Sequence, residues 1–317
     1  MSSIKRLTIS ISQIAPLVGL DAYNNFPRII CEIWRKYDPD NFKIIESKLK
    51  ENKHQIATAS DFNDIWEIDN EFGTNFLEQV KEINLNTDKS STEMVQKQST
   101  ILKQIIESKD LNEIQKTNLS QKICSATNKS HGITNESSIL DEFCRLSEKT
   151  IVNTNQWVKQ IFIKNSSDDT TGDTTDDIIE ESKHNIEWCI IGKYDGITSD
   201  NELIEAKMRQ KCLFKKVRDY ENIQVQLYLH ALEFEKAYLV ESFTNKKGEM
   251  NIYVNEINYN SDYVNDVILD RLKKFIKFFN LFLNNEEYKE GLLKGDKDRK
   301  IYKIYEKEFL GIEHMDF

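Results

Sequence analysis

The spacing of apolar residues predicts two helices at the start of the chain. Residues 8–20 (TISISQIAPLVGL) begin with threonine and serine and then become apolar at helical spacing. This pattern predicts a capped helix whose N-terminus lies near Ser10 or Ser12. A second stripe of apolar residues predicts a helix over residues 26–37. We therefore expect residues 1–37 to form N-terminal helices joined to the core.

The next segment, residues 38–130, is rich in lysine, asparagine, glutamine and serine and contains no convincing internal repeat. Its apolar residues recur at helical spacing only in short pieces, which predicts a helical elaboration that is partly mobile. The predicted helical pieces cover residues 41–50, 75–83, 93–108 and 110–125.

A further helix is predicted at 131–150 (HGITNESSILDEFCRLSEKT). Ile133, Glu136, Leu140 and Phe143 fall at i, i+3, i+7 and i+10, and thus on one face of that helix. A carboxylate on an apolar stripe usually lies at an exposed helix end. The other interpretation is that Glu136 points into a functional site.

Strand patterns dominate the second half of the chain. The stretches QWVKQIFIK, EWCIIGKYDG and NELIEAKMR predict strands, and ITSD predicts a turn between the last two. AYLVESF and MNIYVNEI flank TNKKGE and predict a hairpin. Helices are predicted at 219–236 and at 261–284, where Val264, Ile268, Leu272, Phe275 and Phe279 would face inward.

This order of helices and strands predicts an α/β fold, with a central mixed sheet flanked by helices and a helical N-terminal elaboration. We expect residues 131–285 to form the core, interrupted by an acidic loop insertion at 166–183, and residues 286–317 to form a C-terminal tail.

Charge is distributed unevenly along the chain, whose net charge of −10 at first disfavours nucleic acid as a partner. Residues 166–181 contain seven acids and no base, which is typical of a solvated loop. Residues 207–218 (KMRQKCLFKKVR) contain six bases and no acid. A basic segment of this kind is either a solvated surface or a phosphate-binding track.

The chain has five scattered cysteines and no C-x-x-C pair, which argues against disulfides and a zinc site. The sequence contains no signal-peptide pattern and no apolar run of membrane-spanning length. We therefore expect a cytoplasmic protein that is not secreted and has no membrane partner.

Candidate chemistry lies between Asp195 and Lys207. Asp195 ends one predicted strand, and Glu205 and Lys207 point to the same side of the next strand because they are two residues apart. Two carboxylates and the Ala206 carbonyl would form a hard-oxygen site suited to Mg²⁺ or Mn²⁺. A neighbouring lysine can orient water or stabilise charge on phosphate, so the set suits metal-assisted phosphodiester hydrolysis. A hairpin with ordinary surface charges is the alternative.

Two residues on the 219–236 helix extend this set. Gln224 and Tyr228 are four residues apart and therefore share a helix face. Gln224 could hold the attacking water or the phosphate. Alternatively, both are polar residues on a half-exposed helix.

Four motifs, GITNE, GKYDGI, LIEAK and YENIQVQLYL, stand in the order found in the lambda-exonuclease type of restriction-endonuclease-like, PD-(D/E)xK nucleases. The chain most resembles the YqaJ-like viral recombinases of large DNA viruses. Their pattern of G-x-x-x-E, D-G, E-x-K and Q-x-Q would be carried by Gly132 with Glu136, Asp195 with Gly196, Glu205 with Lys207, and Gln224 with Gln226. A competing pair, Gly73 and Glu78, has the wrong spacing.

The resemblance implies a Mg²⁺-dependent 5′→3′ exonuclease on double-stranded DNA ends, acting in recombination or repair, with Mn²⁺ as a substitute cation. Asp195, Glu205 and Ala206 would bind the metal, and Glu136 would help to bind it or would bind a second ion. Lys207 would activate the water and Gln224 would position it.

The resemblance also suggests how DNA is held. Ser12, with Lys5 or Arg6, would bind the terminal 5′-phosphate. Further DNA contacts are expected from Arg209, Lys215, Lys216 and Tyr228.

The expected partners are DNA ends and a single-strand annealing protein in an infected host cell, and a homo-oligomer is an open alternative. An endonuclease of the same fold, such as a junction resolvase or nickase, is one alternative function. A catalytically inactive DNA-binding scaffold is the other.

Overall fold

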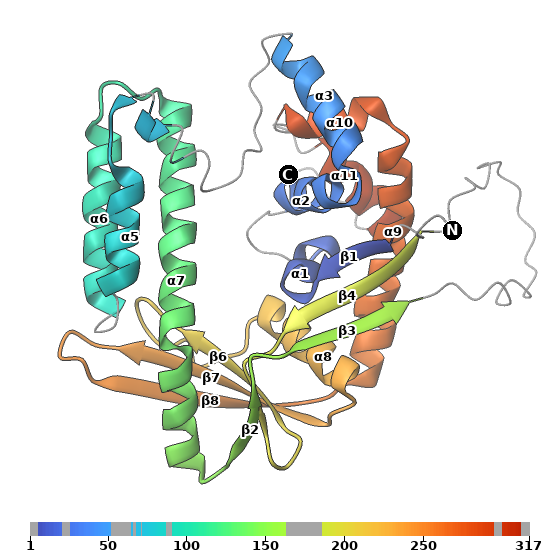
Figure 1. Cartoon of the computed structure of the whole chain (residues 1–317). Helices are drawn as coiled ribbons and strands as arrows, with labels where there is room; N and C mark the ends of the chain where they lie inside the picture. Colours follow the sequence, from blue (N-terminus) through green and yellow to red (C-terminus); the bar gives the residue numbers. More distant parts are fainter. Residues whose placement is uncertain are drawn as a thin grey trace, which may run out of the picture.

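The computed structural model describes residues 6–20, 26–51, 65, 68–70, 72–86, 91–162, 186–294 and 300–311 (Figure 1). Lys5 and the acidic insertion at 166–183 lie outside these residues. The described strands form a three-stranded sheet ordered β1-β4-β3 and a five-stranded sheet ordered β2-β5-β6-β7-β8. Helices cover both sheets, which confirms the predicted mixed α/β class.

One extended segment contributes to both sheets. Strand β4 (Glu187–Lys193) lies between β1 (Arg6–Ser10) and β3 (Trp157–Phe162). After Tyr194 and Asp195 the chain continues as β5 (Gly196–Thr198), which pairs with β2 (Ile151–Thr154) in the other sheet. Asp195 therefore stands where the chain passes from one sheet to the other.

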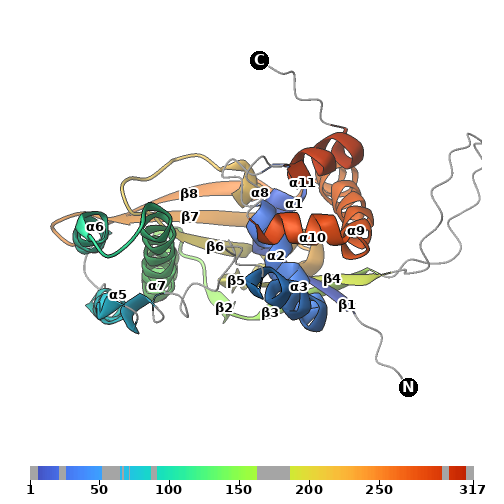
Figure 2. The same ribbon diagram turned by 90° about the horizontal axis from the view of Figure 1, so that it is seen from above.

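The five-stranded sheet is mixed. Strand β6 (Leu203–Met208) is antiparallel to β5 and parallel to β7 (Lys236–Thr244). Helix α8 (Asp219–Leu232) connects the parallel pair, and β8 (Met250–Asn258) completes the predicted hairpin with β7. Figure 2 shows these strands side by side, with β8 at the edge.

A three-helix unit packs on one face of the larger sheet. Helix α7 (Glu113–Ser147) contacts β6, β7 and β8 and also packs against α5 (Phe76–Asn86) and α6 (Ser91–Glu107). These helices stand together on the left in Figure 1. Helix α7 runs without a break through residue 130, so the expected division between 38–130 and 131–285 falls inside one helix.

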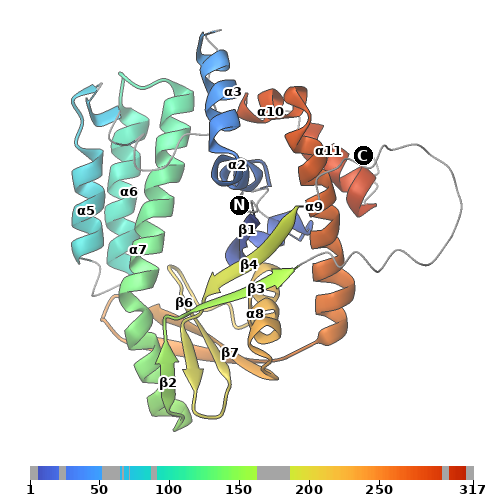
Figure 3. The same ribbon diagram turned by 45° about the vertical axis from the view of Figure 1, so that its right-hand side comes forward.

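The remaining helices share one core around the other end of the molecule. Helices α2 (Phe26–Tyr37), α3 (Pro39–Glu51), α9 (Asp270–Leu283), α10 (Glu286–Leu293) and α11 (Lys300–Ile304) group together there (Figure 3). The five inward positions predicted at 261–284 are all buried, although the first turns, Tyr263–Leu269, form a π-helix.

The predicted C-terminal tail belongs to this core. Leu292, Leu293, Tyr302 and Tyr305 are buried, and the Tyr305 ring stacks on that of Phe26. Apolar residues in α10, α11 and the π-helix Tyr305–Leu310 account for this packing. Among the described residues, no helix has the length and apolar character of a membrane span.

The N-terminal prediction was partly wrong. A strand, β1, replaces the first half of the predicted 8–20 helix, and a 3₁₀ turn (Ile11–Gln13) and the short α1 (Ile14–Leu17) follow it. Leu7 and Ile9 alternate with the exposed Arg6 and Thr8, so this segment has the period of a strand. Parallel pairing with β4, far along the chain, stabilises it there.

Candidate active site

Two backbone hydrogen bonds, from two different segments of the chain, hold Asp195 in place. Its Oδ2 accepts a hydrogen bond from the Ala206 backbone N–H over 2.7 Å, and its carbonyl accepts one from the Asn155 N–H over 3.2 Å. The first bond ties the carboxylate to β6. The second ties the backbone to the segment that leads into β3.

Alternation along β6 separates a polar face from an apolar one. Ile204, Ala206 and Met208 pack with Ile139, Leu140 and Phe143 of α7. Glu205 and Lys207 point to the opposite side, where both contact Gln224 of α8. The sequence prediction that Glu205 and Lys207 share one side is therefore confirmed.

Glu205, Lys207 and Gln224 form a closed triangle of polar contacts. Lys207 Nζ lies 2.5 Å from Glu205 Oε1 and donates to Gln224 Oε1 over 3.3 Å. Gln224 Nε2 donates to the same Glu205 Oε1 over 2.8 Å. The other Glu205 oxygen, Oε2, is buried and has no hydrogen-bond partner within the part of the chain that the structure describes.

The Ala206 carbonyl is oriented toward Asp195. In a strand, the N–H and C=O of one residue point to the same side, and the Ala206 N–H points to Asp195. The β5–β6 pairing ends at Gly196 and Ile204, so no strand partner stands beside Ala206 on that side. This carbonyl is therefore not used by a neighbouring strand on the side of Asp195.

Burial and neighbouring negative charges raise the pKa values of the Asp195 and Glu205 carboxyl groups. Burial, with the nearby charge of Glu136, raises the pKa of Asp195 to about 6 against the opposing effect of Lys207. Burial and the charge of Asp195 raise the pKa of Glu205 to about 7. Burial alone would lower the pKa of Lys207, but Glu205 and Asp195 outweigh it, and the net shift is upward. Lys207 is therefore a cationic donor at neutral pH.

The oxygens near Asp195 are the ones that could hold a divalent cation. Glu205 Oε2 and Glu136 Oε1 are both buried without partners, and buried carboxylate oxygens normally have one. Asp195, Glu205 and the Ala206 carbonyl supply the hard oxygens that Mg²⁺ prefers. Among the described residues, no three Asp, Glu, His or Cys side chains gather into a metal cluster. Glu136 thus acts on Asp195 through its charge and does not complete a three-carboxylate cluster.

Tyr228 does not lie on a DNA-binding surface. Its side chain is 2% exposed, and its hydroxyl donates to the Lys193 carbonyl over 2.8 Å. The prediction that it contacts DNA was wrong because its place on α8 faces the end of β4. A Cβ on Gly192 would lie 2.5 Å from Tyr228 Cε1, so this glycine provides the space for the ring.

Arg209 is also buried rather than available to DNA. It donates to Glu221 Oε1 over 2.7 Å and to Glu241 Oε1 over 2.6 Å. Arg209 directly follows β6 with the same parity as Glu205 and Lys207, so it faces Glu221 of α8 and is only 7% exposed. The predicted DNA contact was therefore wrong.

The Arg209 network holds the basic loop between β6 and α8. Glu241 Oε2 accepts the backbone N–H groups of Phe214 and Lys215 over 2.7 and 3.0 Å. The Phe214 ring lies under Arg209 and also under Arg218, at 4.2 and 3.9 Å from the ring centroid. Sequence reasoning missed Glu221 and Glu241, because nothing local distinguishes them from surface acids.

The other predicted phosphate ligands are spread out. Lys215 and Lys216 are exposed on the loop that Glu241 anchors, and Ser12 is exposed just beyond β1. Arg6 begins β1, roughly 13 Å from Ser10 at strand spacing, and pairs with Glu187 over 3.1 Å. The structure therefore does not bring Arg6 together with Ser12.

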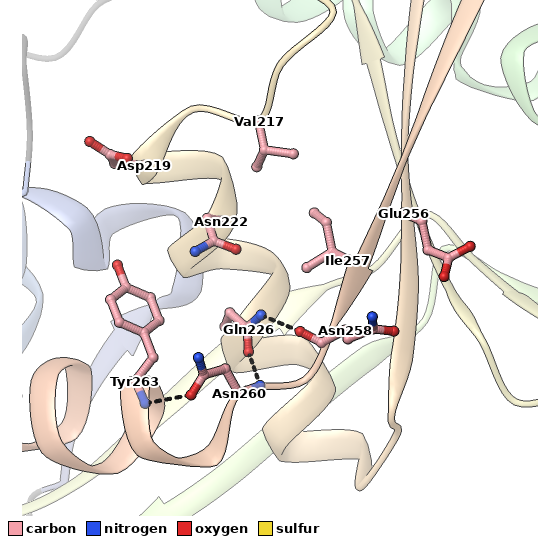
Figure 4. Close-up of a pocket in the computed structure, with 9 residues that line it drawn as sticks. All are labelled: Val217, Asp219, Asn222, Gln226, Glu256, Ile257, Asn258, Asn260 and Tyr263. Carbon is pink, nitrogen blue, oxygen red and sulfur yellow. Dashed lines mark hydrogen bonds between the residues drawn. The ribbon is translucent and has the colours of Figure 1, made fainter.

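Gln226 has a structural role on the opposite side of α8. Its Nε2 donates to the Asn258 carbonyl and its Oε1 accepts the Asn260 N–H, both over 2.8 Å. Figure 4 shows these bonds beside an open, amide-lined hollow that also includes Asn222 and Tyr263. They join α8 to the end of β8, away from Gln224.

No protein-family model matches the chain, and no curated protein sequence matches it. The crystal structure of SSO0001 is similar with a TM-score of 0.33 and 13% identity, over 65% of this chain and 84% of that chain. An alkaline exonuclease (LHK-Exo) from Laribacter hongkongensis has a TM-score of 0.35 and 11% identity, over 63% and 90%. Similarities this weak carry no weight for function.

Proposed function

We propose that the chain is a metal-dependent deoxyribonuclease that hydrolyses phosphodiester bonds at the Asp195–Glu205–Lys207 site. The observation that carries the proposal is the convergence of these three residues with Gln224, together with the unpartnered Oε2 of Glu205. Surface carboxylates on an ordinary hairpin would be exposed and would not have pKa values raised by burial, as those of Asp195 and Glu205 are.

Each residue has a distinct role in this proposal. Asp195, Glu205 and the Ala206 carbonyl hold Mg²⁺, which supplies charge stabilisation at the phosphate when it is bound. Lys207, as an ammonium group, donates to a phosphate oxygen or orients water beside it. Gln224 fixes Glu205 and Lys207 in one geometry. Lys215 and Lys216 provide charge for the DNA backbone.

The finer proposal is a 5′→3′ exonuclease on double-stranded ends, of the YqaJ-like type. Its support is the order of the sequence motifs. The structure presents the matching elements in the same order: α7 with Glu136, the Asp195–Gly196 bend, β6 and α8. Ser12 is the remaining described candidate for the terminal phosphate, and a single-strand annealing protein is the matching partner.

The test is digestion of linear duplex DNA that carries a 5′-phosphate and a label at either end. Wild type, Lys207→Ala and Lys274→Ala are compared with Mg²⁺ and with EDTA. Lys274 is a surface lysine on α9 and serves as the matched control. Mononucleotides released from the 5′ end, only with Mg²⁺ and not by Lys207→Ala, are the expected result.

Other outcomes are equally informative. Internal cuts, or nicking of covalently closed circles, would retain the active site and change the function to an endonuclease. Full activity of Lys207→Ala would disprove the site. DNA binding without cleavage under Mg²⁺ or Mn²⁺ would favour an inactive scaffold.

A further inference from the structure

The three-stranded sheet exposes a large aromatic side chain near the proposed active site. Along β3, Val158 and Phe162 face the main core, whereas Trp157, Lys159 and Ile161 face outward. Trp157 is 67% exposed and Ile161 is 44% exposed. An indole with this much open surface is largely unused by the described core, so its ring is available to a ligand.

Strand register places lysines around this indole. Lys193 of β4 is directly opposite Trp157, and Ile191 is opposite Lys159. Lys193 and Lys159 are both exposed, and among the described residues neither has a carboxylate within ion-pair distance. The outward face thus alternates rings and aliphatic groups with lysines that form no ion pair among the described residues, and the charge of Lys193 also acts on Asp195.

This face continues into the proposed active site. The Tyr194 N–H donates to the Gln156 carbonyl over 3.1 Å, and the Asn155 N–H donates to the Asp195 carbonyl over 3.2 Å. Trp157 follows directly. From strand spacing, Trp157 lies roughly 8 Å from Asp195. That distance is on the order of one or two nucleotides along a strand.

Charge and ring together favour single-stranded nucleic acid as the occupant. Aromatic side chains bind every base through stacking, and interleaved lysines contact the backbone. The core of a protein-binding patch is instead depleted of charged residues, particularly lysine. On this face the lysines lie among the apolar groups. Lys159 stands between Trp157 and Ile161 along β3, and Lys193 stands opposite Trp157 on β4.

We propose that Trp157, with Lys159 and Lys193, forms a stacking site for an unpaired base one or two nucleotides from the bond cleaved at Asp195 and Glu205. This inference rests on the proposed function, because it assigns the site a strand that has left its duplex. The site takes any base, because stacking does not read hydrogen-bonding edges.

The test is binding of oligo(dT) in EDTA, where cleavage does not interfere, read out by intrinsic tryptophan fluorescence and by anisotropy of a labelled oligonucleotide. Of the four tryptophans, Trp34 and Trp188 are buried and Trp66 lies outside the described residues. Stacking on Trp157 should quench the wild type, and the quenching that Trp157→Phe loses is the part due to Trp157. Trp157→Ala should bind about ten-fold more weakly. Trp157→Phe should retain most of the affinity and lose most of the quenching. Tyr253→Ala removes an exposed aromatic from β8 and should bind like the wild type.

A second substrate sharpens the result. An abasic residue is placed at successive positions in the oligonucleotide. One position should weaken wild-type binding about as much as Trp157→Ala does, and should have no further effect in that variant. Unchanged affinity of Trp157→Ala, or unchanged quenching in Trp157→Phe, overturns the proposal and leaves this face to a protein partner. The nuclease proposal is judged separately, by cleavage in Lys207→Ala.

Discussion

Gln224 donates to the Glu205 oxygen Oε1, the atom that Lys207 also contacts. Both donors reach Oε1, and Glu205 Oε2 has no hydrogen-bond partner among the described residues. The amide therefore fixes the rotation of the carboxylate, so that its unpartnered oxygen has a defined direction. The same amide accepts from Lys207 and sets the position of the ammonium group.

Replacing Gln224 with alanine should slow cleavage more than it weakens DNA binding. Without the amide, Glu205 and Lys207 lose the side chain that hydrogen-bonds to both and fixes their relative positions. Misplaced catalytic groups lower the rate about 100-fold. Single-turnover cleavage and DNA affinity are measured for each variant. Asn222→Ala removes an amide from the opposite side of α8 and should leave both unchanged. Equal losses of rate in the two variants would contradict a positioning role.

The cation should stabilise the protein more at alkaline than at acidic pH. Burial raises the pKa of Asp195 to about 6 and that of Glu205 to about 7, whereas unfolded carboxyls titrate near about 4. Between about pH 4 and pH 7 the folded chain therefore holds protons that the unfolded chain has released. The free energy of unfolding of the metal-free protein consequently falls as the pH rises through this window.

Thermal unfolding with and without Mg²⁺ at pH 5 and pH 8 measures this effect. The increase in Tm caused by Mg²⁺ should be larger at pH 8, because protons then no longer compete for the carboxylates. Asp195→Asn should lose most of the increase and be more stable than wild type in EDTA at pH 8. An equal increase in Tm at both pH values would count against a carboxylate-held cation.

Loss of Arg209 should destabilise the fold. Arg209→Met leaves Glu221 and Glu241 buried without their cation, which costs about 3–5 kcal/mol. Urea denaturation measures the change, and Lys216→Met is the control on the exposed part of the same basic segment. Adding Glu221→Gln and Glu241→Gln to Arg209→Met should restore much of the loss. If Arg209→Met were as stable as the wild type and bound DNA more weakly, Arg209 would have to be assigned to the DNA-binding surface after all.

Gly192 should not tolerate alanine. The added Cβ would lie 2.5 Å from Tyr228 Cε1, and overpacking of this kind costs about 1–3 kcal/mol. Gly132→Ala is the matched control, because a Cβ there meets no atom within 4 Å. Tyr228→Leu should relieve part of the loss in the double variant. Similar Tm values for both glycine variants would show that the ring moves at no cost.

Local periodicity in the sequence was sufficient to predict the side-chain directions in the central part of the site. The two-residue repeat of β6 correctly placed Glu205 and Lys207 on one side. The helical repeat put Glu136 on the apolar stripe of its helix and left open whether it is exposed or points into a site, and the structure buries its Oε1. The two-residue repeat also places Arg209 on the side of Glu205 and Lys207, but its charge suggested exposure. Its partners lie 12 and 32 residues away, so no local pattern could show that it is neutralised.

Long-range pairing explains the failures at the ends of the chain. Strand β1 pairs with β4, and Arg6 meets Glu187, a residue 181 positions later. Propensity near Ser10 favoured a helix, and this distant partner decided otherwise. Likewise the space for Tyr228 exists only because residue 192 is a glycine on another element.

The passage of one extended segment from β4 into β5 has a mechanical consequence. Asp195 lies at the junction, with its backbone bonded to Asn155 and its carboxylate bonded to Ala206 of the larger sheet. A rotation of one sheet against the other would therefore pivot close to this carboxylate. Asp195 is only two residues beyond Lys193, the last residue of β4. A force that a bound substrate exerts on the outward face of the three-stranded sheet would therefore reach the proposed catalytic centre through a very short piece of backbone.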